Sequence, residues 1–228
     1  MPHKLRRLVA GGCLVAAPLV YVAGLLTDPA LRAGDAADGA YGRHPGQVSV
    51  SAALLHWSWV LLVPGIIGMI HLVRRRAVLF GHIAGLVALL GVVNFSALML
   101  GDFFYARLEA DLGTAAGDRL ADAAFAAGGA QWGFQVPGFL GLLGVLLLGL
   151  ALAYDRRVPW WAPPAMLAGM LAGPVYPIGM IAGSLLYIAG AGVIGVRMLR
   201  MTDAEWAQEP VAGGTAAAPP SGNVAATV

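Results

Sequence analysis

Five long stretches of the chain contain no Asp, Glu, Lys or Arg, and they constrain the fold more than any other feature. They cover residues 8–27, 44–73, 77–101, 123–154 and 158–196. A helix that crosses the ~30 Å hydrocarbon core of a bilayer needs about 20 mainly apolar residues. Each stretch is therefore long enough to hold at least one membrane-spanning helix.

The composition excludes several classes of protein. Hydrophobic residues make up 59% of the chain and charged residues 11%, whereas a soluble domain carries about 25% charged residues. So few charges cannot cover the surface of a soluble fold, which excludes a soluble enzyme, a nucleic-acid-binding protein and a disordered chain. The formal net charge of +2 is also too small to indicate a nucleic-acid partner.

The fifth stretch has to turn back on itself. As one helix, its residues 158–196 would run for about 58 Å, roughly twice the hydrocarbon thickness. The segment Gly173-Pro174-Val175-Tyr176-Pro177 holds paired helix breakers. We therefore expect two helices, near 159–174 and 178–199, with a re-entrant first segment as the alternative because Pro163 and Pro164 lie near its start.

The predicted fold is an all-α, polytopic transmembrane bundle of six spans within residues 1–200. The spans are expected near 8–27, 51–73, 77–101, 132–154, 159–174 and 178–199. Between the third and fourth spans, apolar residues of 103–130 recur at helical spacing, which predicts a short helix at the membrane surface. Residues 201–228 are expected to form a largely disordered cytoplasmic tail.

Basic residues predict the orientation. With six spans, ten of the 14 Lys and Arg residues fall on one side of the membrane. They are Lys4, Arg6, Arg7, Arg74, Arg75, Arg76, Arg156, Arg157, Arg197 and Arg200. The positive-inside rule then places both termini in the cytoplasm. The first span is expected to remain as an uncleaved anchor, because its apolar stretch is longer than that of a signal peptide.

No Asp, Glu, Lys or Arg lies in the middle of any predicted span, which disfavours an ion-coupled transporter. The polar residues that remain as candidates are His56, His71, His82, Asn94, Asp102 and Gln135. His56 lies near the outer surface beside two tryptophans, where an aromatic-belt histidine is the simpler interpretation. The functional hypothesis is a hydrogen-bonded outer cluster of His56 with Asp102, Gln135 or both.

On the inner side, we expect Arg74, Arg75 and Arg76 to contact lipid headgroups. His71 precedes these arginines by one turn, and His82 lies about five residues into the third span. Asn94 lies deep in that span, where an interhelical hydrogen bond is expected.

Haem b would need a pair of axial ligands at similar depth on facing helices. His71 and His82 are at similar depth, but a short turn joins their helices and leaves little room for a porphyrin. The spacing of potential ligands predicts no zinc site. We therefore expect no cofactor, with haem b as the alternative.

These observations favour a non-enzymatic integral membrane protein in a bacterial plasma membrane, acting as a structural, regulatory or partner-binding component. One alternative is a redox protein that binds haem or quinone through its transmembrane histidines, and another is a carrier of a small neutral solute. Expected partners are the lipid bilayer and another membrane protein or a second copy. Helix faces of small residues, such as Gly81 with Gly85 and Gly179 with Gly183, would serve such contacts or pack within the bundle.

Overall fold

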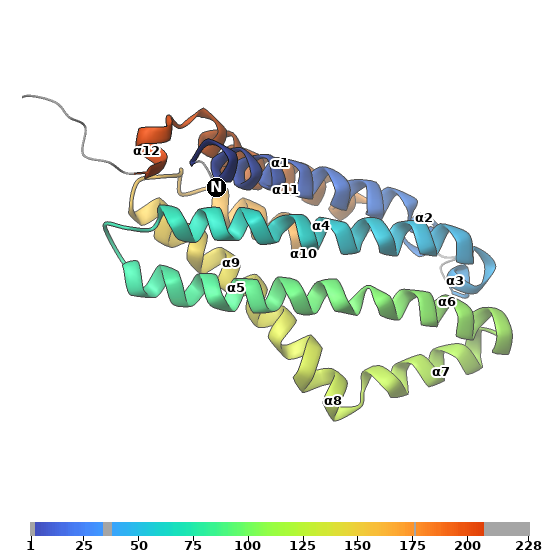
Figure 1. Ribbon diagram of the computed structural model, residues 1–228. Helices are drawn as coiled ribbons and strands as arrows, with labels where there is room; N and C mark the ends of the chain where they lie inside the picture. Colours follow the sequence, from blue (N-terminus) through green and yellow to red (C-terminus); the bar gives the residue numbers. More distant parts are fainter. Residues whose placement is uncertain (1–2, 34–37, 176, 208–228) are drawn as a thin grey trace, which may run out of the picture.

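The computed structural model describes residues 3–33, 38–175 and 177–207, and over these ranges the chain is helical without strands. The described chain begins with the long helix α1 (His3–Thr27), which runs along the bundle, and the short helix α2 (Pro29–Ala33) follows it directly. A short α3 (Ala40–Arg43) precedes the long α4 (Pro45–Leu72), which runs back beside α1 (Figure 1). Proline in the first turn of α4 suits the helix start, because the first N–H groups have no intrahelical acceptor.

The middle of the chain contains a long helical run that folds back on itself before it returns across the bundle. Helix α5 (Val78–Leu98) continues almost directly into α6 (Leu100–Leu112), and α7 (Thr114–Phe125) folds back along α6. Residues Gly128–Ala130 (α8) and Gln131–Gln135 (the π-helix η2) then lead into α9 (Val136–Tyr154). The expected surface helix in 103–130 is thus present as α7, but the third span extends further than predicted because α6 prolongs it.

The last part of the chain contains a short helix between two longer ones. Helix α10 (Ala162–Ala172) packs against α11 (Ile178–Arg200), which lies beside α1. The final short helix α12 (Asp203–Ala207) packs on α1, so this part of the expected tail is ordered. The prediction of disorder for residues 208–228 lies outside the described residues.

Five helical segments are long and apolar enough to cross a membrane, which indicates a multi-pass membrane protein. They are His3–Thr27, Pro45–Leu72, Val78–Leu112, Gly128–Tyr154 and Ile178–Arg200. Helix α10, the expected fifth span, has 11 residues and extends about 16 Å, which is near half the hydrocarbon thickness. Large apolar side chains such as Leu79 and Ile178 lie 76% and 79% exposed, as expected for a surface that faces lipid.

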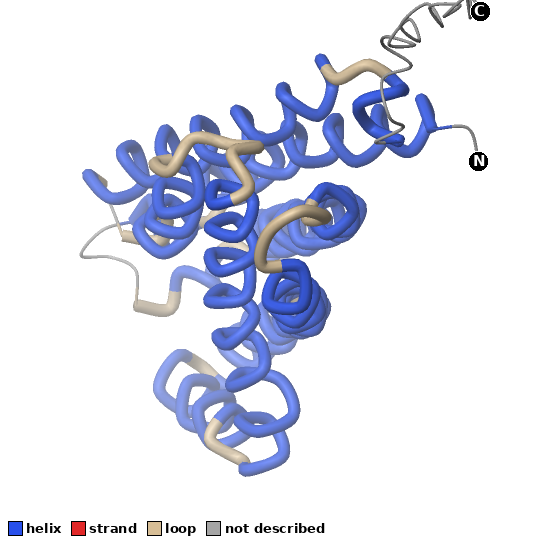
Figure 2. The backbone as a smooth tube through the Cα atoms, turned by 90° about the vertical axis from the view of Figure 1, so that its left-hand side faces the viewer, coloured by secondary structure: helices blue, strands red, loops and turns tan. Residues whose placement is uncertain are grey.

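Two glycines allow the closest helix crossing. Gly91 of α5 meets Gly141 of α9 so closely that a Cβ atom added to Gly91 would meet the partner's Cα and lie 2.7 Å from its backbone nitrogen. Figure 2, in which α4 and α5 are seen end-on, shows α9 crossing them at a steep angle. Small residues therefore serve packing inside this bundle, because they let helix backbones approach.

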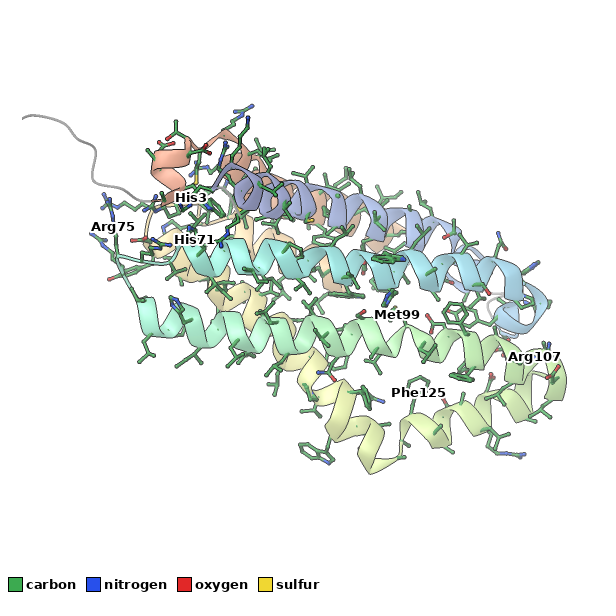
Figure 3. The ribbon with its side chains drawn as sticks, viewed as in Figure 1. His3, His71, Arg75, Met99, Arg107 and Phe125 are labelled. Carbon is green, nitrogen blue, oxygen red and sulfur yellow. The ribbon has the colours of Figure 1, made fainter. Side chains whose placement is uncertain are left out.

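The two ends of the bundle differ in charge. We call the end that carries the N-terminus, the α4–α5 turn and α12 the basic end, because Arg6, Arg7 and Arg74–Arg76 lie there (Figures 1 and 3). The opposite end, formed by α2, α3, α6 and α7, is called the loop end. Several aromatic side chains that line a cavity gather towards the loop end.

Candidate binding cavity

A cavity of about 440 Å³ lies between the helices towards the loop end. We call it the aromatic cavity, because five aromatic side chains from five helices line it: Tyr21, Tyr41, Trp59, Phe95 and Phe139. Figure 3 shows another lining residue, Met99, where α5 passes into α6 opposite α4. Its volume lies within the range of cavities that bind small molecules, about 300–1,000 Å³.

Four of the five lining rings, all except that of Tyr41, pack against one another in a row. The ring of Tyr21 meets Trp59 edge-on, with centroids 6.2 Å apart, and meets Tyr187 edge-on at 5.3 Å. Trp59 stacks on Phe95 at 4.8 Å, and Phe95 meets Phe139 edge-on at 5.4 Å. These geometries hold the rings in fixed orientations, because edge-to-face and offset-stacked pairs are the preferred arrangements of aromatic quadrupoles.

A buried carboxylate closes one side of the cavity. Asp28 is 6% exposed, and its Oδ1 accepts hydrogen bonds from the backbone N–H groups of Ala30 and Leu31 at 2.9 and 3.2 Å. These bonds satisfy N–H groups at the start of α2, which is the ordinary role of an aspartate before a helix. The Tyr41 hydroxyl donates to Asp28 Oδ2 at 3.0 Å. Burial, and then the negative charges of Asp102 and Asp28, raise the pKa of Tyr41, so its hydroxyl keeps the proton that it donates.

A second cavity of about 500 Å³ adjoins the first and shares Ala30, Tyr41 and Asp102 with it. We call it the acidic vestibule, because four of its lining residues are acids: Asp38, Asp102, Glu109 and Asp118. Phe125, which Figure 3 labels beside α7, also lines it.

Two of the vestibule carboxylates are held by hydrogen bonds within the loop end. Glu109 is 7% exposed and accepts a 2.6 Å bond from the Gly42 N–H, which ties α6 to α3. Asp118 accepts a 2.9 Å bond from the Tyr105 hydroxyl, and Tyr105 in turn meets Tyr41 edge-on at 5.7 Å. These acids therefore have structural partners.

Asp102 differs from its neighbours. It lies between the aromatic cavity and the acidic vestibule, lines both, and has no hydrogen bond or ion pair with any described residue. The described lining of the two cavities contains no Lys, Arg or His. This junction is therefore a place where a positive charge would be attracted and an anion repelled.

The hydrogen bonds of His56 and Gln135 do not join the predicted outer cluster. His56 Nδ1 lies 2.8 Å from Ser96 Oγ and 3.3 Å from the Ser96 carbonyl oxygen. Gln135 donates instead to the Phe125 carbonyl at 2.9 Å. Over the described residues, no hydrogen bond connects either side chain to Asp102, because a nearby serine or carbonyl already satisfies each one.

The expected interhelical bond of Asn94 is also absent from the described part of the chain. Its amide donates to the carbonyl of Leu90, one turn earlier on the same helix, at 2.7 Å. The expectation fails because an asparagine in a helix can satisfy its donor on the backbone of its own helix.

The other two candidate histidines, His71 and His82, also have hydrogen-bond partners. His71 Nε2 donates to the Trp206 carbonyl at 2.9 Å, its Nδ1 accepts from Arg74 at 2.8 Å, and its ring stacks on Trp206. His82 lies on an exposed helix face and donates from Nδ1 to the Val78 carbonyl at 2.7 Å. No group of three or more potential metal ligands occurs in the described segments.

The arginines of the α4–α5 turn have varied contacts. Arg74 also donates to the His71 carbonyl, and Arg76 lies over the Tyr154 ring at 5.7 Å. The small-residue faces considered for partner contacts also meet neighbours within the chain, with Gly85 against Ile70 and Gly183 against the backbone of α10.

The aromatic cavity cannot be recognised from its residues one at a time. Its residues look like ordinary core or interfacial residues when each is taken alone, and Asp28 looks like a helix-end residue. One signal was available: Tyr21 lies one and a half turns before the end of α1, while Phe95 lies about one turn before the end of α5. The distance of each ring from the end of its helix would have predicted that the two rings lie at a similar depth in the membrane.

No protein-family model, curated protein or solved structure matches this chain.

Proposed function

We propose that this protein is a non-enzymatic, membrane-embedded binding protein whose aromatic cavity takes an amphipathic organic cation. The observation that supports it most is Asp102, a carboxylate without a described partner at the neck of a cavity walled by aromatic rings. The cationic group would lie near Asp102, and the apolar body would lie among Tyr21, Trp59 and Phe95.

The lining suits both the positive charge and the apolar body of such a ligand. Aromatic faces carry negative electrostatic potential and attract organic cations, most strongly where water is excluded. A carboxylate at the neck adds a charge-assisted contact, which is stronger than a contact between neutral groups. A purely apolar ligand would leave Asp102 unpaired beside it, and that arrangement is costly for a partly buried carboxylate.

This proposal refines the partner-binding role expected from the sequence, and it differs from the two alternatives. A carrier of a neutral solute would gain nothing from a carboxylate without a partner at the neck. A haem or quinone site would use the transmembrane histidines, yet none of these lines the aromatic cavity among the described residues. The cavity also lacks a described nucleophile with an adjacent base, so we assign it no reaction.

We further infer a placement in the membrane. Six spans with both termini in the cytoplasm would put the basic end inside and the acidic vestibule outside, in agreement with the positive-inside rule. In this placement α10 is the short fifth span and α11 the sixth, and the protein resides in a bacterial plasma membrane. A cation from outside would then meet the vestibule acids before it reaches the aromatic rings.

Binding of tetraphenylphosphonium, a bulky aromatic cation, tests the role of Asp102. Equilibrium dialysis against the protein in phosphatidylcholine nanodiscs should give saturable binding above that of empty nanodiscs. Asp102→Asn keeps the side-chain shape and removes the charge, so the affinity should fall about tenfold or more, because charge-assisted contacts contribute roughly 1.5–3 kcal/mol.

The matched control is Asp111→Asn. Asp111 lies on the same helix, is exposed and pairs with Arg107 at 2.8 Å, but it lines neither cavity. Its substitution should leave the affinity within about twofold, since surface pairs contribute little. Equal affinities of wild type and Asp102→Asn would refute the proposed ligand class.

A further inference from the structure

A separate cavity of about 310 Å³ lies at the basic end, between α1, α4 and α12. Its walls are apolar and include Val9 of α1 together with Pro64 and Ile67 of α4. Val9 is 42% exposed and Ile67 is 54% exposed, so the cavity opens onto the apolar outer surface of the bundle. In a membrane, that surface faces lipid chains.

The polar lining residues of this cavity are Arg6, His71 and Trp206. Arg6 lines it and has no hydrogen bond or ion pair with a described residue. Trp206 also lines it and is 2% exposed, and its indole Nε1 is buried without a hydrogen-bond partner. A buried indole N–H usually finds an acceptor, and its absence is costly.

The acceptors near these donors are already occupied. The Trp206 carbonyl accepts from His71, and Arg7, which follows Arg6, takes the Asp203 carboxylate at 3.2 Å. Figure 3 shows His3, His71 and Arg75 at this same end of the bundle. The surroundings of Arg6 are therefore basic, and an anion would find favourable charge and unused donors.

We propose that this cavity binds an anionic phospholipid, with the headgroup phosphate at Arg6, beside the Trp206 ring, and one acyl chain along Val9 and Ile67. A phosphate oxygen accepts strong hydrogen bonds from guanidinium and N–H donors. The apolar walls lead from these donors to the lipid-facing surface, which is the layout of a phospholipid molecule. This site does not depend on the aromatic cavity, which lies at the other end.

Native mass spectrometry of the protein in mixed phosphatidylglycerol and phosphatidylcholine measures this binding. Wild type should retain one phosphatidylglycerol in preference to phosphatidylcholine. Arg6→Gln should lower that retention about fivefold, because a basic residue near an anionic surface contributes roughly that factor. Ile67→Trp should fill the part of the cavity that would hold the acyl chain, and it should therefore reduce the retention of both lipids.

Arg75→Gln is the matched control, since Arg75 belongs to the same basic end but does not line the cavity. It should retain phosphatidylglycerol as the wild type does. Equal losses in Arg6→Gln and Arg75→Gln would show only a diffuse charge effect and would overturn the site. Displacement of the lipid by inorganic phosphate alone would assign the site to a free anion and would also overturn the lipid proposal.

Discussion

At the scale of single residues, the loop end shows how acids near a membrane differ in what they can do. Asp28, Glu109 and Asp118 each accept at least one hydrogen bond from a defined donor, so their charge is already used to hold helices together. Asp102 lacks such a donor among the described residues. A carboxylate of this kind is available to a ligand, because binding would supply the partner that the fold does not.

Tyr41→Phe tests the structural role assigned to Asp28. The substitution keeps the ring and removes the hydroxyl that donates to a carboxylate of 6% exposure. We expect the free energy of unfolding to fall by about 1–3 kcal/mol, the cost of leaving a buried acceptor short of a donor.

Unfolding of the purified protein in mixed micelles, followed by circular dichroism, measures this change. The control is Tyr154→Phe, because Tyr154 is 51% exposed and Arg76 contacts its ring rather than its hydroxyl. If both variants were equally stable, the bond from Tyr41 to Asp28 would contribute nothing.

The hydrogen-bond partners of the polar side chains were the feature hardest to predict from the sequence. The position of His56 along its helix predicted a place near the outer surface. Its partner is Ser96, because α4 and α5 pack against each other at the level of these two residues. A serine carries no signal in a span, since it is small and common there. Asp102 was named as a candidate from the sequence, whereas its position between two cavities depends on how α2, α3 and α7 fold over the bundle.

At the scale of helices, close backbone contact determines which elements pack together. The crossing of α5 and α9 depends on Gly91 and Gly141, whose backbones meet, whereas Gly65 of α4 makes room for the side chain of Leu14 on α1. In lipid, such contacts supply van der Waals energy that larger side chains would block.

Gly91→Ala tests the importance of this crossing. The added Cβ would meet the backbone of α9, so the helices must separate, and overpacking of this kind costs typically 1–3 kcal/mol. A thermal melt of the detergent-solubilised protein should show a lower midpoint. Gly12→Ala is the control, because a Cβ there would meet nothing within 4 Å; its midpoint should stay or rise. A stable Gly91→Ala protein would contradict the close crossing.

The apolar runs predicted where long helices lie better than where they end. Helix α11 covers residues 178–200, close to the expected 178–199, since breakers and arginines bound it. Helix α4 begins at Pro45, six residues before the expected start, because the polar entry sequence is itself helical. Helix α10 is shorter than predicted, since Pro163 and Pro164 lie in its first turn and Gly173-Pro174 follows its end.

At the scale of the whole molecule, charge separates the two ends of the bundle. Arginines cluster at the end that carries the N-terminus and α12, and the acids of the vestibule lie at the other end. With six spans this polarity predicts that both termini lie in the cytoplasm.

Reporter fusions test that orientation. A phosphatase or fluorescent-protein fusion after Asp155 and another after Met201 should both report the cytoplasm. The two sites lie on either side of α10 and α11, so they report the same side only if both helices together cross the membrane twice or not at all. A fusion after Gly113, in the α6–α7 turn, should report the outside. An external signal at Asp155 or Met201 would contradict the six-span arrangement.

If the aromatic cavity selects for positive charge, the sign of a ligand's charge should decide how tightly the ligand binds. Tetraphenylphosphonium and tetraphenylborate have nearly the same shape and opposite charge, so their saturable binding to wild type in phosphatidylcholine nanodiscs isolates the sign of the charge. After subtraction of empty nanodiscs, the cation should bind at least about tenfold more tightly than the anion, in line with one charge-assisted contact. Equal or tighter saturable binding of the anion would show that the cavity does not select for positive charge.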